Sequence, residues 1–513
     1  MATFTYPGVY VEELSSGLHT IAGVATSIAA FIGWAPQGPV TGATMVESWP
    51  EYERLFGGLD SRSLLGYAVN QFFGNGGQQT YIVRLAANAT DTPALTAATT
   101  ATNTISTLTL YATSPGAWGN EISVTITVQP GSRFSLLVQR VAGTQTTTLE
   151  NFVNLSVSPT DPNYVYNVID SDSAYITFIN PATSPPAPPA TAPTMPIAAT
   201  ALLGSGTPGV DGDVLDPNDG TGNFDLALLS TTGGIGVNLL DRVNIFNLLC
   251  VPGEATGATI STLQHYCNTK RAFYIVDAPR LSTPSGLSAS GPDAGIIGTY
   301  ASNSAYYFPW VLAPDALFGN RPALFPPCGF VAGIYAATDA GRGVWKAPAG
   351  ITAGLTGNSG LQYNLTDKEN GDLNTQAINC LRQFKVYGDV VWGARTLAGN
   401  DLAGSQWKYV PIRRLALYLE SSLFDGTQWV VFEPNDETLW GQVRMNVGAF
   451  MQNLFLEGAF AGTTPQQAYF VKCDAENNPA SSVALGIVNI LVGFAPLYPA
   501  EFVVIQIQQM IGQ

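Results

Sequence analysis

The chain of 513 residues is longer than a single hydrophobic core usually supports, so we expect two to four domains. Charged residues make up only 11% and hydrophobic residues 46%, and a surface with so few charges favours burial against partners. The formal net charge of -16 argues against nucleic acid as a partner, because binding phosphates needs clustered Lys and Arg side chains. Five scattered cysteines without CxxC spacing predict free thiols in a reducing compartment and no disulfide framework.

Neither a secretion signal nor a membrane span is expected. The apolar stretch 21–35 follows Glu12 and Glu13, and the first Lys or Arg is Arg54, so the positive segment of a signal peptide is missing. The most apolar long window, 486–505, is interrupted by Asn, Pro and Glu residues. We therefore expect a soluble chain without direct membrane insertion.

The first part of the chain, residues 23–104, has the pattern of an α/β layer. An apolar strand is predicted in VATSIAAFIGWAPQGP, short helices in SWPEYERLFGG and SRSLLGYAVNQFFGNGG, and a second strand in QTYIVRL. The order strand, helix, helix, strand predicts one part of an α/β core.

Residues 105–198 are expected to form a β-rich inserted domain. In EISVTITV, residues 122, 124, 126 and 128 are apolar and alternate with Ser and Thr, and the turn 129–132 leads into a second strand, RFSLLVQR. The proline density of residues 181–196 allows only an extended connector, which we place at the end of this domain.

A central α/β domain is predicted for residues 199–375. Two apolar segments, LLDRVNIFNLLCVPG and KRAFYIVDAP, end in turn residues, and ATISTLQHYCN between them has helical character. This βαβ pattern predicts a parallel pair of strands.

Residues 376–513 form the last predicted domain. We expect a helix in VPIRRLALYLESSL, a buried strand in TQWVVFEP, and a second helix that Asn435 or Asp436 caps and Gly458 ends. That second helix has one apolar stripe, made of Val443, Val447, Phe450 and Leu454. The chain closes with PAEFVVIQIQQM, read as a strand, so a strand is expected near each terminus: this one and YPGVYVEEL at the start.

A search for catalytic, cofactor and metal sites finds no convincing candidate. The chain has only two histidines, His19 and His265, and His265 and Cys267 diverge on a helix because they are two residues apart. GSGTPG (204–209) matches a phosphate loop as a string, but a proline and nearby aspartates favour a flexible loop. DGDVLDPNDG (211–220) departs from a calcium loop at its fifth and sixth positions, which favours a solvated turn. We expect no cofactor.

Several long stretches resemble the contractile tail sheath proteins of bacteriophages and of phage-tail-like contractile injection systems. YPGVYVEEL is similar to that family's N-terminal arm motif, and IAAFIGWAPQGP to the strand after it. Further similar stretches are residues 329–350, 373–397, 407–436 and 489–509. Residues 105–200 resemble nothing in the family that we can name.

The resemblance implies a discontinuous α/β core built from both halves of the chain, a β-rich inserted domain, and terminal β-strand arms that pair with neighbouring subunits. The implied arm residues are Pro7, Gly8, Val9, Tyr10 and Val11 at one end and Phe502, Val503, Val504, Ile505 and Ile507 at the other. The resemblance implies an N-terminal arm of residues 1–22, with the glycine-bearing segment 15–23 as slack. By the same resemblance, a short helix near Lys472, Asp474 and Glu476 contacts an inner tube.

The resemblance also implies a function. The chain is expected to be a structural subunit and no enzyme, to stack as hexameric rings around the inner tube, and to shorten so that the tube is driven through a target envelope. Baseplate and terminator (cap) proteins are the implied partners. Assembly is expected in the bacterial cytoplasm, as part of a phage tail virion or an injection-system particle. A static structural polymer, such as a surface-layer or tube-like protein, is the alternative.

Overall fold

The computed structural model describes residues 19–90, 92, 94–180, 188–231, 235–402 and 404–504. The chain divides into two compact units, Ala25–Arg413 and a smaller one made of Met1–Val24 with Arg414–Gln513. Within the described ranges, no helix combines the length and the apolar character that crossing a bilayer requires.

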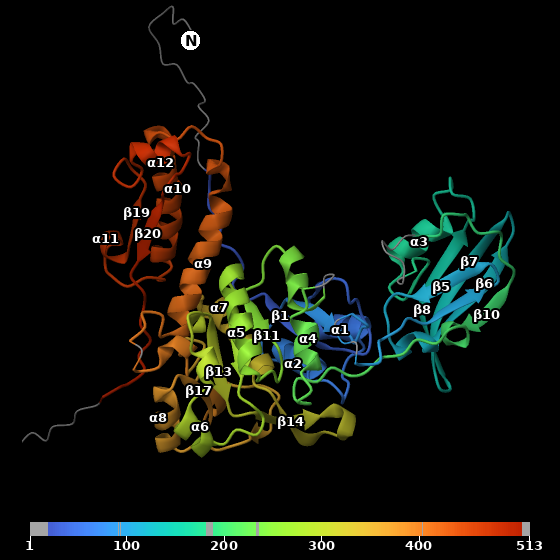
Figure 1. Cartoon of the computed structure of the whole chain (residues 1–513), viewed down its shortest axis with the longest axis horizontal. Helices are drawn as coiled ribbons and strands as arrows, with labels where there is room; N and C mark the ends of the chain where they lie inside the picture. Colours follow the sequence, from blue (N-terminus) through green and yellow to red (C-terminus); the bar gives the residue numbers. More distant parts are fainter. Residues whose placement is uncertain are drawn as a thin grey trace, which may run out of the picture. The chain divides into compact units, whose positions relative to one another are not determined.

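An eight-stranded sheet lies at the centre of the larger unit, in the order β18-β17-β13-β12-β11-β1-β3-β2 (Figure 1). Its strands are β1 Ala29–Trp34, β2 Thr44–Val46, β3 Thr80–Leu85, β11 Leu248–Cys250, β12 Phe273–Asp277, β13 Ser304–Phe308, β17 Ile378–Phe384 and β18 Gly388–Val391. The six inner strands pair in parallel, and β2 and β18 pair antiparallel at the two edges. The parallel pairing of β11 with β12 confirms the predicted βαβ unit. Strands from both sides of the insertion therefore share one sheet.

Helices cover both faces of this sheet. The helices of this part include α1 Trp49–Phe56, α2 Leu65–Gly74, α4 Asn223–Leu228, α5 Gly257–Lys270, α6 Pro284–Ser290, α7 Cys328–Arg342 and α8 Asp367–Thr375. On one face Phe31 of β1 meets Phe72 of α2, and α2 packs against α7. On the other face Ile32 joins a hydrophobic core with Leu263 of α5. Neighbouring residues of β1 thus serve opposite faces, as strand geometry requires. A small sheet of β14 Val311–Asp315, β15 Arg321–Phe325 and β16 Gly360–Leu361 completes this part.

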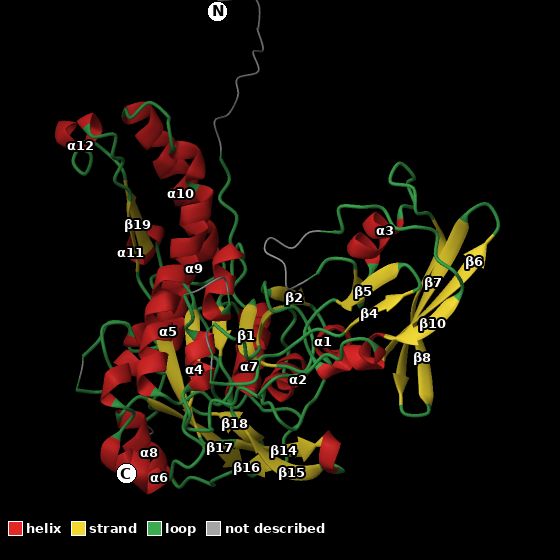
Figure 2. Ribbon diagram, turned by 45° about the vertical axis from the view of Figure 1, so that its right-hand side comes forward, coloured by secondary structure: helices red, strands yellow, loops and turns green. Residues whose placement is uncertain are grey.

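The inserted segment has its own hydrophobic core. Its elements are β4 Thr102–Ile105, β5 Leu108–Ala112, β6 Ile122–Gln129, β7 Arg133–Ala142, β8 Gln145–Leu155, α3 Val165–Asp172, β9 Ile176–Thr177 and β10 Ala199–Leu202. They form sheets of order β10-β6-β7-β8 and β4-β5-β9. Ile122, Val124 and Ile126 are buried in that core, as the alternation predicts, whereas Val128 is exposed. Figure 2 shows this mostly β segment in yellow.

The strands that enter and leave the insertion lie side by side. The amide of Thr99 donates to the carbonyl of Val210 at 2.9 Å, and that of Thr102 to Thr207 at 2.9 Å. A Cβ at Gly206 would lie 2.3 Å from the carbonyl oxygen of Thr102, so glycine is needed for this approach. The GSGTPG segment, for which we expected a flexible loop, is therefore hydrogen-bonded to the segment that contains Thr102.

The smaller unit holds two long helices and a short sheet. Its elements are α9 Val410–Gly426, which begins in the larger unit, η8 Gln428–Val430, α10 Glu437–Leu456, α11 Pro465–Ala468, β19 Tyr469–Lys472, α12 Ala480–Ala484 and β20 Leu491–Phe494. The carboxylate of Asp436 accepts hydrogen bonds from the amides of Thr438 and Leu439, which confirms the predicted cap. The predicted stripe of α10 is buried.

Two strand predictions in this unit need correction or stay open. The segment TQWVVFEP is a 3₁₀ turn and connector between two helices, in which Val431 and Phe432 are exposed, and it pairs with no strand among the described residues. In PAEFVVIQIQQM, the residues up to Val504 form no strand, and residues 505–513 lie outside the described part.

Candidate assembly surface

The smaller unit contains a sheet of only two strands. β19 and β20 pair antiparallel from Tyr469 opposite Phe494 to Lys472 opposite Leu491, and one isolated bridge, between Phe460 and Pro496, extends the pairing. Neither strand has another strand partner in the part of the chain that the structure describes. A two-stranded sheet is marginal by itself, and its open edges are templates for further strands.

Apolar side chains are exposed on this sheet and beyond it. Phe470 and Leu491 lie on the two strands, and both are more than half exposed. Downstream, Phe502, Val503 and Val504 are 75%, 81% and 81% exposed. Exposed apolar surface of this kind is typical of protein interaction sites.

The described N-terminal residues run along α9. His19 stacks on Trp429 with ring centroids 4.1 Å apart, Ile21 is buried, and the amide of Val24 donates to Ser422 Oγ at 3.2 Å. The predicted arm residues Pro7, Gly8, Val9, Tyr10 and Val11 lie outside the described residues, as do Ile505 and Ile507. The described residues that adjoin the two predicted arms, 19–24 and 502–504, belong to the unit that holds the two-stranded sheet.

The three residues predicted to face a tube lie together at the turn after β19. Lys472 Nζ is 2.6 Å from the carboxylate of Glu476, and this hydrogen bond raises the pKa of the Lys472 amine. Asp474 accepts a hydrogen bond from the amide of Glu476 at 2.9 Å. The short helix expected in this stretch is α12.

Asparagines hold this turn in a way that the sequence analysis missed. Asn477 Nδ2 donates to the carbonyl of Asn489 at 2.8 Å, and the amide of Asn489 donates to Asn478 Oδ1 at 2.5 Å. A pair of asparagines in AENNP is typical of a turn, but nothing local in the sequence indicates a partner eleven residues away.

The candidates for chemistry lie apart from one another. His265 is exposed and stacks on Tyr300 at 4.6 Å, whereas Cys267 is buried, and burial raises the pKa of its thiol. All five cysteines are free and buried. The described residues contain no cluster of three or more His, Cys, Asp or Glu side chains suited to a metal ion.

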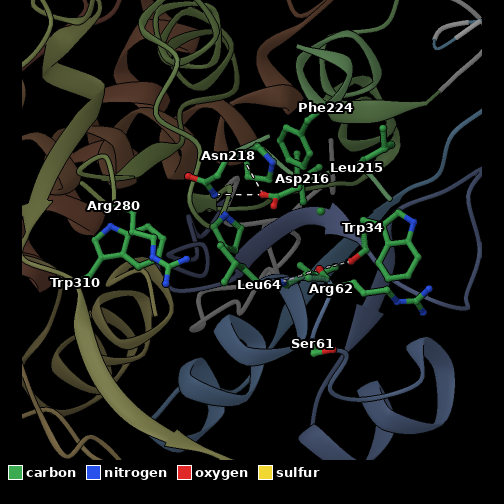
Figure 3. A pocket seen from close by; sticks show the side chains of 16 residues that line it. Trp34, Ser61, Arg62, Leu64, Leu215, Asp216, Asn218, Phe224, Arg280 and Trp310 are labelled. Atoms are coloured by element: carbon green, nitrogen blue, oxygen red, sulfur yellow. Dashed lines mark hydrogen bonds between the residues drawn. The ribbon is translucent and has the colours of Figure 1, made fainter. Parts of the chain in front are cut away.

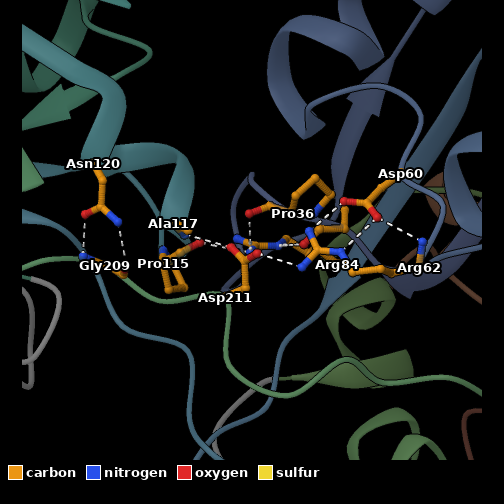
Figure 4. A network of polar contacts seen from close by, with 10 residues as sticks. Pro36, Asp60, Arg62, Arg84, Pro115, Ala117, Asn120, Gly209 and Asp211 are labelled. Atoms are coloured by element: carbon orange, nitrogen blue, oxygen red, sulfur yellow. Dashed lines mark hydrogen bonds and ion pairs between the residues drawn. The ribbon is translucent and has the colours of Figure 1, made fainter. Parts of the chain in front are cut away.

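Arg84, at the end of β3, is the centre of a buried polar network that the sequence did not reveal (Figure 4). Its guanidinium donates to the carbonyls of Ala35 at 2.8 Å, Gly38 at 2.6 Å, Pro36 at 3.1 Å and Pro115 at 2.9 Å. Arg84 is 1% exposed, and burial lowers its pKa to about 10. Because Pro115 belongs to the insertion and the other three carbonyls to the core, Arg84 ties the two together.

Aspartates from the DGDVLDPNDG segment take part in the same attachment. Asp211 accepts from Arg62 at 2.9 Å and from the amide of Ala117 at 2.7 Å, and Asp213 accepts from the amide of Thr96 at 2.8 Å. These carboxylates serve different partners, so the segment is a structural connection and not the solvated turn that we expected.

Solved structures show which class of protein has this fold. The helical sheath of the anti-feeding prophage in its contracted state matches with a TM-score of 0.59 at 22% identity, covering 99% of this chain and 100% of that one. A sheath tail protein from Listeria innocua matches with a TM-score of 0.60 at 12% identity, covering 93% and 96%. The fold is that of sheath proteins of contractile tails and injection systems.

Family models and relatives then identify the family. The model described as the phage tail sheath protein central domain matches residues 243–397, and the phage tail sheath C-terminal domain matches residues 403–510. The chain therefore belongs to the contractile tail sheath protein family, a family of structural proteins, which confirms the resemblance. Neither model reaches the insertion.

Two curated relatives agree with this assignment. A putative prophage major tail sheath protein of Pseudomonas aeruginosa (strain UCBPP-PA14) is 28% identical over 270 residues, 51% of this chain and 66% of that protein. The tail sheath protein of Vibrio phage KVP40 is 27% identical over 168 residues, 32% of this chain and 24% of that protein. The matches span less than two thirds of the length of these relatives.

Proposed function

We propose that this sheath subunit polymerises as stacked hexameric rings around an inner tube and shortens to drive the tube through a target envelope. The observation that carries the proposal is the two-stranded sheet β19–β20, which has no further strand partner among the described residues and lies in the same unit as residues 19–24 and 502–504. A chain of similar fold, with a TM-score of 0.57 and 22% identity, belongs to the six-fold symmetrised baseplate of the anti-feeding prophage, which supports six-fold rings and a baseplate partner.

The terminal arms connect the subunits. Residues 7–11 and 502–507 each add a strand to the β19–β20 sheet of a neighbour, where main-chain hydrogen bonds hold them and the side chains of Val9 and Val11 cover its exposed apolar residues. The exposure of Phe502, Val503 and Val504 supports this role, because a free chain end with these residues gains by burial.

Contraction is a rigid-body rearrangement of subunits that stay connected. A mesh tied by backbone hydrogen bonds lets subunit bodies rotate and repack without separating, and the segment 15–23 supplies the slack. The low charge content supports large interfaces between subunits in the contracted form.

The remaining partners of the proposed assembly are those that the family resemblance implies. The turn with Lys472, Asp474 and Glu476, together with α12, faces the inner tube, baseplate proteins lie below the rings, and a terminator or cap lies above them. The subunit assembles in the bacterial cytoplasm and becomes part of a phage tail or an injection-system particle. The inserted domain lies on the outside.

Electron microscopy of the purified protein tests the proposal. We expect ribbed hollow cylinders, and two forms of different length and width when they are assembled with and without the tube protein. Monodisperse globules at high concentration would contradict polymerisation. Cylinders of a single fixed geometry under all conditions would favour the alternative, a static structural polymer.

A further inference from the structure

The strand order of the main sheet reverses at β1, because the chain adds β2 and β3 on one side of β1 and the later strands on the other side. On one side of β1 lie β3 and β2, and on the other side β11 is followed outward by β12, β13 and β17. The chain after β1 leads to α2 on one face, whereas the chain after β11 leads to α5 on the opposite face. In open parallel sheets, a crevice forms where the carboxyl ends of two such strands meet.

A pocket occupies this crevice (Figure 3). Trp34 at the end of β1 and Pro252 after β11 line it, together with Leu215, Phe224 and Trp310. Its volume is about 150 Å³, whereas sites for small molecules usually enclose about 300–1,000 Å³. The pocket therefore has room for one side chain and not for a nucleotide.

Arg280 supplies an unpaired cation at this pocket. Its guanidinium lies 5.8 Å from the ring centroid of Trp310, and it has no ion-pair partner in the part of the chain that the structure describes. Hydrogen bonds hold the wall around it: Gln362 Nε2 donates to the carbonyl of Arg280 at 3.0 Å, and Trp310 Nε1 donates to the carbonyl of Ala278 at 2.7 Å. The guanidinium of Arg280 thus lies near the ring of a tryptophan that a hydrogen bond holds in place.

The other charged groups of the pocket already have partners. Arg62, which lies with Trp34 on the side opposite Arg280 in Figure 3, is 2.7 Å from Asp60 and 2.9 Å from Asp211. The carboxylate of Asp216 accepts hydrogen bonds from the amide of Asn218 at 2.9 Å and from its Nδ2 at 3.3 Å. Among the described residues that line the pocket, no carboxylate forms an ion pair with Arg280.

We propose that this pocket binds an Asp or Glu side chain of a second copy of this chain, with Arg280 as its cation and Trp310 as the wall. Charge complementarity selects this occupant, because the chain carries 37 Asp and Glu but only 21 Lys and Arg, so neighbouring copies present unpaired carboxylates. The inference rests on the proposed polymerisation and adds a specific contact to it.

The substitution Arg280→Lys allows the partner to be identified, because it keeps the charge and supplies an amine. A zero-length carbodiimide joins that amine to a touching carboxylate as an amide, with loss of water. In cylinders assembled from equal parts of unlabelled and heavy-isotope-labelled protein, we expect mixed-isotope peptides that join position 280 to an acidic residue of another copy. Links only within one copy, or none at position 280, overturn the proposal. If wild-type protein forms no cylinders, the proposed function fails instead.

Matched variants measure the strength of the contact. Arg280→Gln should raise the critical concentration for assembly about fivefold, the effect of losing one partly exposed ion pair. Arg321→Gln, which removes an exposed arginine on β15, should leave it unchanged. Asp216→Asn keeps the acceptor of its turn but removes a negative charge that lines the pocket and would repel an incoming carboxylate, so it should lower the critical concentration. Equal values for Arg280→Gln and Arg321→Gln would refute the proposal.

Discussion

Glu254 is a fully buried carboxyl group in the loop after β11. Its Oε1 accepts from the amide of Thr256 at 2.6 Å, while its Oε2 and the buried Oδ1 of Asp225 receive no donor from any third group among the described residues. Burial, reinforced by hydrogen bonding and charge repulsion with Asp225, raises the pKa of Glu254 to about 8. At neutral pH Glu254 therefore holds a proton, which it can share with Asp225.

This raised pKa makes stability depend on pH. The contribution of Glu254 is fully present below its unfolded pKa near 4.5 and is lost as pH rises to about 8, by roughly 1.4 kcal/mol per unit. Asp277, whose pKa burial raises to about 6, adds to the lower part of this range. We expect the melting temperature of dilute subunit to fall from pH 5 to 8. Glu254→Gln, which mimics the protonated group, should flatten the decline above pH 6; parallel curves would contradict this assignment.

Arg84 stabilises the fold through the carbonyls that it satisfies. Arg84→Met keeps the apolar stem but leaves buried carbonyl oxygens without donors, so we expect a loss of about 3 kcal/mol in the free energy of unfolding. Equilibrium unfolding in urea measures this loss in the free energy of unfolding. As a control, Arg140→Gln removes an exposed pair with Glu121 and should cost less than about 1 kcal/mol. Equal effects of the two substitutions would mean that the Arg84 network contributes no more than a surface pair.

At the level of elements, the sequence predicted helices and strands that have a periodic apolar pattern, but it did not reveal whether a strand-like segment has a partner strand. β1, α2, β6, α5 and α10 lie where their apolar patterns indicate, because each pattern reports burial against a core. TQWVVFEP has the composition of a strand, but strand formation also needs a neighbour in a sheet, and composition does not report that neighbour.

The N-terminal arm should carry polymerisation and not the fold of the subunit. Val9→Pro removes a ladder donor and fixes φ, so a strand added to a neighbour's sheet should be lost, and deletion of residues 1–14 should act in the same way. Val11→Asp should also fail, because it places a charge on the buried face of the added strand. Sedimentation velocity and thermal melting should show soluble, cooperatively melting protein without long cylinders.

The control for the arm is Glu13→Gln, which should polymerise normally, because an exposed charge at a sheet edge contributes little. Full-length cylinders of Val9→Pro and of the deletion would exclude the arm as the connector. Melting without cooperativity would instead assign the strand to the core of the subunit itself.

Charge reversal at Lys472 tests the surface assigned to the tube. Lys472→Glu replaces the ion pair with Glu476 by repulsion and should weaken co-assembly with the tube protein, measured by co-sedimentation. Lys385→Glu, a reversal outside this unit, serves as the control. Unchanged co-assembly of Lys472→Glu would remove this turn from the tube-facing surface.

At the scale of the whole molecule, the inserted segment should be dispensable for assembly. Because Thr102 and Thr207 are bridged antiparallel neighbours, residues 103–206 can be replaced by an Asn-Gly hairpin turn. We expect this variant to melt cooperatively and to form cylinders in electron micrographs. A variant that folds, by circular dichroism, but does not assemble would place the insertion within an interface.

The sequence indicated this segment but not its ends. The β-rich texture and the proline-rich connector located it at residues 105–198, yet its sheet continues through β10 to Leu202, and its attachment reaches Asp211. The long-range bonds of Arg84 and Asp211 depend on folding, and a lone arginine in an apolar strand gives no sign of its partners. The pocket at β1 and β11 likewise follows from strand order, which no local pattern specifies.

The adjacent entry and exit strands have a practical consequence. The two segments are hydrogen-bonded to each other, so their ends lie side by side. They form an insertion site for any domain whose own termini are close together. A fluorescent or enzymatic cargo placed there would be repeated once per subunit along a cylinder, at a spacing set by the core and not by the cargo. In the proposed assembly, with the inserted domain on the outside, this domain could then be exchanged without redesigning the sheet core.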